Sequence, residues 1–450
     1  MKKITFVFLE LILITSMALA GCTSQGTEAP AGEQPATGEE AEVPAAGAGK
    51  EVTLRFFHKW PEPEQLEYYN YVIAEFNKIH PEIKIEMEAA SDEAYKDKIR
   101  VLMASGDIPD IYFSWAGEFS WKFARAGQAL DLTDALMNSD WKDKIVMSAV
   151  EPYKVNEKVY GIPMRINAKF MVYNKDMFAA NNLSIPTTWD EFLAVAETLK
   201  QVGITPIAFG NEFPWASAHY VGDFNAKLVN PETLKADYLL TAEPDKLFTD
   251  PMYVEALSRF KLLNDKGYFN EGANGISHSN ARSSFIAGKA AMFYCELEEF
   301  VTINDEFQNF GFFQLPGGTG GQGDPKLLTG APDGFMISGK TKYPEEAITF
   351  LKFVTSPEMG YEYVKRLGIP SAAVGAVTEE NALPIVVEGL KAINEASGMA
   401  LWMDTDMNIK IVEVYLPGMQ ALITDTKTPE QVMQEVHDIA VTVQKELAAQ

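Results

Sequence analysis

The chain has 450 residues, with 38 lysines and arginines against 63 aspartates and glutamates, so its net charge at neutral pH is −25. At ~100–200 residues per domain, this length predicts two or three domains. The negative charge argues against binding to nucleic acid or docking on anionic lipid, because both need clustered lysine and arginine. The only cysteines are Cys22 and Cys295, which excludes a zinc site of several thiolates and leaves no disulfide framework if Cys22 has another use.

The first 22 residues have the pattern of a secretory signal. Two lysines precede an apolar run over 4–19, which leads into the tetrapeptide LAGC at 19–22. The run is shorter than the ~20 apolar residues that cross a bilayer and contains Glu10, so cleavage is favoured over spanning. LAGC resembles the lipobox of bacterial lipoproteins, which implies a diacylglycerol in thioether linkage on Cys22. The alternative is a plain signal peptide with an accidental cysteine.

Residues 23–50 are rich in alanine, glycine, proline and glutamate, and they contain no aromatic residue. Such a composition cannot bury enough apolar surface to offset the entropy of ordering. We expect a disordered tether between an anchored Cys22 and a folded body that begins at residue 51.

The body opens with alternating strand and helix patterns. Apolar residues at helical spacing predict helices over 64–79 and 95–104. Between and around them, β-rich runs predict strands over 52–57, 83–87 and 110–113. This order is typical of a parallel sheet with crossover helices.

Later helices carry start signals. Thr188 with Glu191 fits a capping box, and Asp250 and Ser356 each precede a proline, as helix caps often do. Helices dominate the last third of the chain. Further strands are predicted over 169–173, 205–209, 290–294, 310–314 and 334–337.

Motifs for catalysis are weak. The run 318–323 matches G-x-G-x-x-G, but no helix is expected to open there, so a surface loop is the better interpretation. None of the five histidines lies in a metal-binding motif. Cys295 ends an apolar strand and is expected to be a buried, inert thiol. The acidic cluster of Glu296, Glu298 and Glu299 could serve a hydrolase, bind a ligand or face solvent.

Tryptophans near strand ends are more informative. Trp60 and Trp115 each follow a predicted strand, while Trp121, Trp215 and Trp402 lie in loops or at helix starts. In open α/β sheets, ligands bind beyond the carboxyl ends of the strands. An indole there suits the C–H face of a sugar, with polar neighbours taking the hydroxyls. The alternative is that these rings belong to the core.

Six short motifs together resemble a known family. In their order and spacing they are similar to the extracellular solute-binding proteins of family 1, the sugar receptors of bacterial ABC importers related to maltose-binding protein. The motifs are GDIPDI at 106–111, YGIP at 160–163 followed by MVYNKD at 171–176, PTTWDEF at 186–192, FIAGKAAM at 285–292, TSPE at 355–358 and GIP at 368–370.

The resemblance implies an α/β, two-domain periplasmic-binding-protein-like fold of type II, with a hinged cleft between the domains. Domain 1 would hold 51–166 plus 315–368, and domain 2 would hold 167–314 plus 369–450. Many relatives carry a stacking tryptophan where this chain has Glu296, which implies more hydrogen bonding there. Ligand contacts are implied at Trp60, Trp115, Glu118, Arg165, Asn167, Trp215, Glu296, Asp333 and Trp402.

The resulting hypothesis is a monomeric lipoprotein on the extracellular face of the cell membrane, of the Gram-positive type, held there by its lipid alone. It would capture a mono- or oligosaccharide by hinge closure and deliver it to the transmembrane subunits of an ABC permease. It would use no cofactor, no metal and no catalytic residue. Two alternatives remain open: a uronate, amino-acid or polyamine cargo, with Arg165 pairing any cargo carboxylate, and a surface carbohydrate hydrolase.

Overall fold

The computed structural model describes residues 51–449. The predicted signal peptide over 1–22, the lipidated Cys22 and the tether over 23–50 lie outside these residues. Within 51–449, no helix is both long enough and apolar enough to cross a membrane.

A nine-stranded sheet runs through the structure in the order β2-β1-β3-β10-β6-β8-β7, with β11 beside β10 and β9 beside β6. A two-stranded hairpin, β4–β5, is separate from it. The strands are β1 (Val52–His58), β2 (Ile83–Ala89), β3 (Ile111–Trp115), β4 (Lys154–Val155), β5 (Lys158–Val159), β6 (Ile162–Asn174), β7 (Thr205–Ala208), β8 (Ala290–Glu296), β9 (Phe310–Phe313), β10 (Leu328–Ile337) and β11 (Met399–Ala400).

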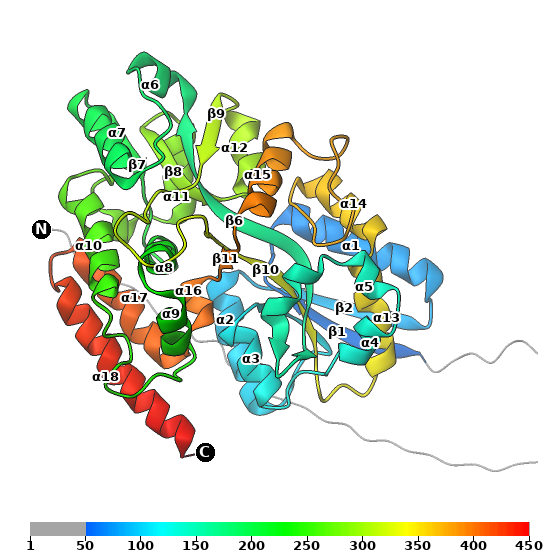
Figure 1. The fold of residues 1–450 in the computed structure, drawn as a ribbon. Helices are drawn as coiled ribbons and strands as arrows, with labels where there is room; N and C mark the ends of the chain where they lie inside the picture. Colours follow the sequence, from blue (N-terminus) through cyan, green and yellow to red (C-terminus); the bar gives the residue numbers. More distant parts are fainter. Residues whose placement is uncertain (1–50, 450) are drawn as a thin grey trace, which may run out of the picture. The chain divides into compact units, whose positions relative to one another are not determined.

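Helices pack along both ends of this sheet (Figure 1). Those in the first third are α1 (Pro63–Ile79), α2 (Asp92–Ser105), α3 (Glu118–Arg125), α4 (Thr133–Met137) and α5 (Trp141–Lys144). The middle of the chain adds α6 (Lys175–Ala180), α7 (Trp189–Gln201), α8 (Trp215–Leu228), α9 (Pro231–Tyr238), α10 (Pro251–Asp265), α11 (His278–Ile286) and α12 (Glu299–Glu306). The last third is mostly helical, as predicted, with α13 (Pro344–Val354), α14 (Pro357–Leu367), α15 (Pro384–Glu395), α16 (Met403–Asp406), α17 (Ile409–Ile423) and α18 (Pro429–Ala448).

Two long antiparallel strands join the ends of the sheet. β1 pairs in parallel with β2 and β3, and β7 pairs in parallel with β8, as alternating strand and helix patterns predict. Between these groups, β6 pairs with β10 through residues up to Ala168 and with β8 and β9 from Lys169 onward. All 13 residues of β6 are buried, and this one strand runs without a break from one end of the sheet to the other (Figure 1).

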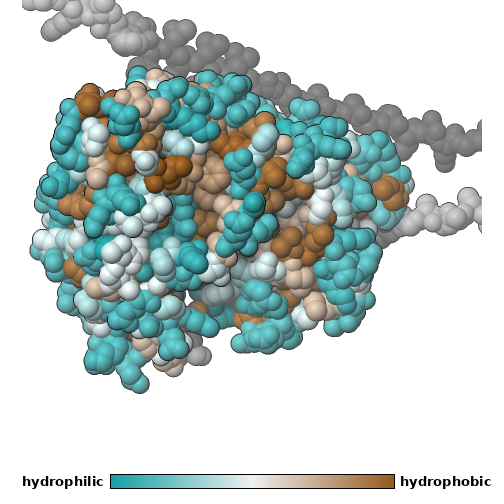
Figure 2. Space-filling model, turned by 45° about the horizontal axis from the view of Figure 1, so that its top comes forward, coloured by the Kyte–Doolittle hydropathy of each residue, from teal (hydrophilic) through white to brown (hydrophobic). Residues whose placement is uncertain are grey.

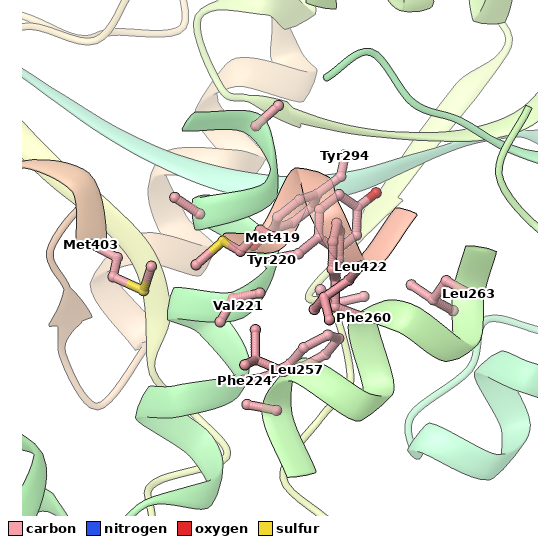
Figure 3. Close-up of a cluster of buried hydrophobic side chains, with 14 of the residues drawn as sticks. Tyr220, Val221, Phe224, Leu257, Phe260, Leu263, Tyr294, Met403, Met419 and Leu422 are labelled. Atoms are coloured by element: carbon pink, nitrogen blue, oxygen red, sulfur yellow. The ribbon is translucent and has the colours of Figure 1, made fainter. Parts of the chain in front are cut away.

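Buried residues form three main hydrophobic clusters. The first surrounds β1, β2, β3, α1, α13 and α14. The second fills the space among β7, α7, α8, α10, α17 and α18, where Phe224, Phe260 and Leu422 meet (Figure 3). The third lies on the opposite face of β8, against α11 and α12. Residues 51–449 belong to one compact unit by their contacts, and the division into two domains drawn from the sequence stays a prediction.

Local signals in the sequence match the structure at the helix starts. Thr188 and Glu191 form a capping box at α7. The side chains of Asp250 and Ser356 accept hydrogen bonds from Met252 and Met359 at the starts of α10 and α14. These caps satisfy amide groups that the first helical turn leaves without partners.

The glycine run 318–323 lies in the connection between β9 and β10, where no helix begins. Arg259 of α10 donates hydrogen bonds to the carbonyls of Gly317 and Thr319, which ties this connection to α10. Cys295 is fully buried in β8, and burial raises the pKa of its thiol, as expected of an inert cysteine. Hydrophilic side chains cover much of the face in Figure 2, with hydrophobic ones gathered in patches.

Candidate ligand-binding site

The carboxyl ends of several strands meet at one edge of the sheet. Because β1, β2 and β3 are parallel, Lys59 past β1, Asp92 past β2 and Trp115 at the end of β3 lie at the same edge. From the other end of the sheet, β8 ends at Glu296 and α8 begins at Trp215. The fold therefore brings side chains from distant segments to one place.

Two adjoining cavities lie at this edge, and Lys59 and Asp92 contribute to the walls of both. The smaller one holds about 50 Å³ and is lined by three indoles, four carboxylates, two ammonium groups and one imidazole. The larger one holds about 600 Å³ and lies between Gln65 of α1 and Thr302 of α12. Both are therefore bounded by elements from the two ends of the sheet.

Eight of the nine predicted ligand residues lie in or beside these cavities. Asn167 lies behind Glu296 and donates a hydrogen bond to it. Glu118 lines neither cavity; Gly117, with a φ of +83°, turns the chain into α3, where Glu118 pairs with Arg125. The smaller cavity is lined by Trp115, Trp215, Glu296, Asp333 and Trp402, and the larger by Trp60 and Arg165.

The tryptophans combine core and cavity positions. Trp60, Trp115 and Trp402 are buried members of the first hydrophobic cluster, yet each also borders one of the cavities. Trp215 is half-buried. His219 lies one turn further along α8, between Trp215 and Trp402. Its ring centre is 4.6 Å from that of Trp402 and 5.3 Å from that of Trp215. These rings form one aromatic side of the smaller cavity.

An ion-pair network lies where the crossing strands meet. Arg165 of β6 stands directly opposite Asp333 of β10, and its Nε and Nη2 atoms lie 2.8 Å and 2.6 Å from Oδ2 of Asp333. The remaining Nη1 donates to Glu298. The guanidinium carbon also lies 4.9 Å from the centre of the Trp60 ring. Arg165 is therefore buried with all three of its nitrogen atoms facing carboxylates of the protein.

A second cross-strand pair is much looser. Lys169 of β6 stands opposite Glu296 of β8, with 4.0 Å between Nζ and Oε1, while Nδ2 of Asn167 lies 2.6 Å from Oε2. Burial, together with the nearby charge of Glu298, raises the pKa of Glu296 to about 8. Burial also acts to raise the pKa of Glu299, but His278 and Arg282 outweigh it and hold that pKa well below its usual range.

Several cavity residues were not foreseen from the sequence. They are Lys59, Asp92, Lys96, His219 and Asp404, each of which lines at least one of the two cavities. They lie beside Trp60, past the second strand, one turn after Trp215 or two residues after Trp402. Glu298, which belongs to the acidic cluster, lines the larger cavity. Helical spacing of four residues would have linked His219 to Trp215 and Lys96 to Asp92.

Comparison with known proteins places this geometry in a family. Residues 60–361 match the model of the bacterial extracellular solute-binding proteins, so the chain belongs to that family. It is 28% identical over 336 residues to a multiple sugar-binding protein of Streptococcus mutans, covering 74% of this chain and 77% of that one. An uncharacterized ABC transporter extracellular-binding protein of Pyrococcus horikoshii is 27% identical over 367 residues, or 79% of each chain.

Solved structures share the fold. A chitin oligosaccharide binding protein superposes with a TM-score of 0.80 at 26% identity, over 88% of this chain and all of that one. A solute-binding protein in complex with raffinose superposes with a TM-score of 0.71 at 23% identity, over 87% of this chain and all of that one. The fold is thus the mixed α/β fold of periplasmic binding proteins.

These findings define the class of protein. The chain is an extracellular solute-binding protein of an ABC transporter, a receptor and not an enzyme. Within 51–449, no cluster of histidine, cysteine, aspartate or glutamate could hold a metal ion. The cavities at the strand ends offer hydrogen-bonding groups and aromatic rings, which suit reversible binding.

Proposed function

We propose that the chain captures a mono- or oligosaccharide in the two adjoining cavities and delivers it to the permease of an ABC importer. The observation that carries this proposal is the smaller cavity, where Trp115, Trp215 and Trp402 surround carboxylates and ammonium groups. Indoles cover the C–H faces of a sugar ring, and charged side chains bond its hydroxyls. Relatives described as binding multiple sugars, chitin oligosaccharides and raffinose support a carbohydrate cargo.

Hinge closure between two domains is the mechanism we propose for capture. β6 and β10 connect the ends of the sheet, and the cavity walls come from both ends. A ligand that contacts both walls at once binds the closed state more tightly than the open one, and so favours closure. We place the receptor on the outer face of the membrane, held by a lipid on Cys22 and working as a monomer.

An acidic cargo is the less favoured alternative. A uronate or an amino acid needs a cation for its carboxylate, and Arg165 is the residue that the sequence offers for that role. In the structure, its nitrogen atoms already face Asp333 and Glu298. Binding a cargo carboxylate there would require breaking buried ion pairs, which costs about 3–5 kcal/mol.

Trp215 gives the sharpest test of the sugar proposal. Truncation of a half-buried ring at the binding surface removes contact area without opening a large core cavity, so Trp215→Ala should bind sugar at least about tenfold more weakly. A thermal-shift screen over a saccharide panel identifies the sugar, and calorimetry on that sugar measures the loss.

Trp121→Ala is the matched control, because Trp121 is also half-buried but borders neither cavity. Its affinity for the sugar should equal that of the wild type. Equal affinities of the Trp215→Ala and wild-type proteins would contradict the proposed site. Release of shortened glycans when the protein is incubated with an oligosaccharide would contradict the receptor role itself.

A further inference from the structure

The wall of the smaller cavity is acidic. Its carboxylates are those of Asp92, Glu296, Asp333 and Asp404, while its ammonium groups are only those of Lys59 and Lys96. Burial lowers the pKa of His219 to about 4, so this imidazole adds no positive charge at neutral pH. A cargo in this cavity therefore meets more negative than positive groups.

Three of the four carboxylates have a close cation. The nearest nitrogen lies 3.0 Å from Asp92, 3.6 Å from Asp404 and 2.6 Å from Asp333. Glu296 differs, because its nearest cation is Lys169 at 4.0 Å and its one short contact is with the neutral amide of Asn167. Glu296 is thus the least neutralised carboxylate of the cavity.

The protonated form of Glu296 is therefore favoured over the ionised form. Burial and the charge of Glu298 raise the pKa of Glu296 to about 8, since an ionised carboxylate without a close cation is unfavourable away from water. A positively charged group from a ligand would remove that penalty and take the place of the proton.

Buried acceptor atoms without a hydrogen-bond partner also favour a ligand that donates hydrogen bonds. Among the described residues, Oδ1 of Asp333 and Oδ1 of Asp404 are buried and have no hydrogen-bond partner. The side chains of Asp333 and Asp404 are 4% and 7% exposed and border the cavity. A ligand rich in N–H and O–H donors would satisfy these atoms, whereas a carboxylate would not.

We propose that the cargo is an amino sugar whose protonated primary amine pairs with Glu296, while the free oxygens of Asp333 and Asp404 accept hydrogen bonds from the same ring. This inference rests on the proposed sugar-receptor function and names the class of sugar. Trp115, Trp215 and Trp402 line the cavity into which the amine would project.

Matched sugars test the inference. Glucosamine, galactosamine and mannosamine are compared with glucose, galactose and mannose, and β-1,4-linked glucosamine oligomers with glucose oligomers of equal length. Binding is measured by calorimetry at pH 6, where the amine is protonated. At least one amino sugar should bind ten times or more tighter than its neutral parent. Glu296→Gln, which keeps an oxygen for Asn167, should remove that preference.

Glu388→Gln is the control variant, because Glu388 is an exposed carboxylate of α15 that lines neither cavity, and the substitution changes the net charge equally. It should keep the preference. If no amino sugar binds more tightly than its parent, the inference is wrong. In that case, binding of any neutral sugar would leave the proposed function standing, whereas binding of spermidine with no response to any saccharide would contradict both.

Discussion

Arg165 illustrates what a single residue does in this site. The family resemblance implies that it is a ligand partner, whereas in the structure it ties β6 to β10 through Asp333 and pairs with Glu298 beside the cavity. Its partners are 168 and 133 residues away in sequence. No local pattern predicts such a pairing. We therefore regard Arg165 as a residue that positions Asp333 for the ligand.

At the same scale, Glu296 should make stability depend on pH. Its pKa rises from 4.5 to about 8 on folding through burial and Glu298, with Glu299 adding negative charge and Lys169 and Lys59 opposing the rise. Between these pH values the native state binds more protons than the unfolded one, so stability falls as pH rises, by up to ~1.4 kcal/mol per pH unit.

Urea unfolding of the empty protein between pH 4.5 and pH 8 checks this. The difference in unfolding free energy between wild type and Glu296→Gln should shift in favour of the variant as pH rises, because glutamine does not titrate. The Glu388→Gln control should follow the wild type. A constant difference between Glu296→Gln and wild type across this range would show that Glu296 is ionised normally.

At the scale of elements, the sequence predicts most helices and strands but not the crossing strands in full. The 3.6-residue and alternating patterns locate β1, β2 and α1, and cap residues locate the starts of α7, α10 and α14. β6 and β10 are longer than predicted. Arg165 and Asn167 interrupt the apolar pattern expected of β6, because they are polar residues that are buried through pairing across strands. Gly330 and Pro332 suggest a loop in place of β10, because glycine and proline are uncommon inside strands.

Fewer of the cavity residues than of the helices and strands could be predicted from the sequence. Tryptophans and Glu296 near strand ends could be found, because the rule that ligands bind at the carboxyl ends of strands needs only strand positions. Helical spacing from Trp215 could also have indicated His219. Asp92 and Asp404 could not be found, because their placement depends on how the segment after β2 and α16 face each other across the cavity. Glu118 was placed in the site through the resemblance alone, and it lines neither cavity.

The junction of β6 and β10 should be sensitive to a single methyl group. An added Cβ at Gly334 would lie 2.2 Å from the carbonyl oxygen of Ile162, beside the register shift between Asp333 and Gly334. Gly334→Ala should therefore lower the unfolding free energy by about 1–3 kcal/mol and weaken sugar binding through the displacement of Asp333.

Gly275→Ala is the matched control, since an added Cβ there meets no atom within 4 Å. Denaturant unfolding of this variant should give a stability within about 1 kcal/mol of the wild type. Equal stability of the Gly334→Ala protein would mean that β6 and β10 separate easily, against the close approach that the structure shows.

At the scale of the whole molecule, the sheet is continuous while its cores are separate. The first hydrophobic cluster surrounds β1–β3, and the second and third surround β7 and β8. Consecutive residues Trp402 and Met403 belong to the first and the second cluster. This segment therefore runs from one cluster to the other beside the smaller cavity, which Trp402 lines.

Capture by closure can be measured by small-angle X-ray scattering with and without a saturating saccharide. The sugar should reduce the radius of gyration at unchanged molecular mass, because both walls of the cavities close on it. Identical scattering curves, with binding verified by calorimetry in the same sample, would contradict capture by closure.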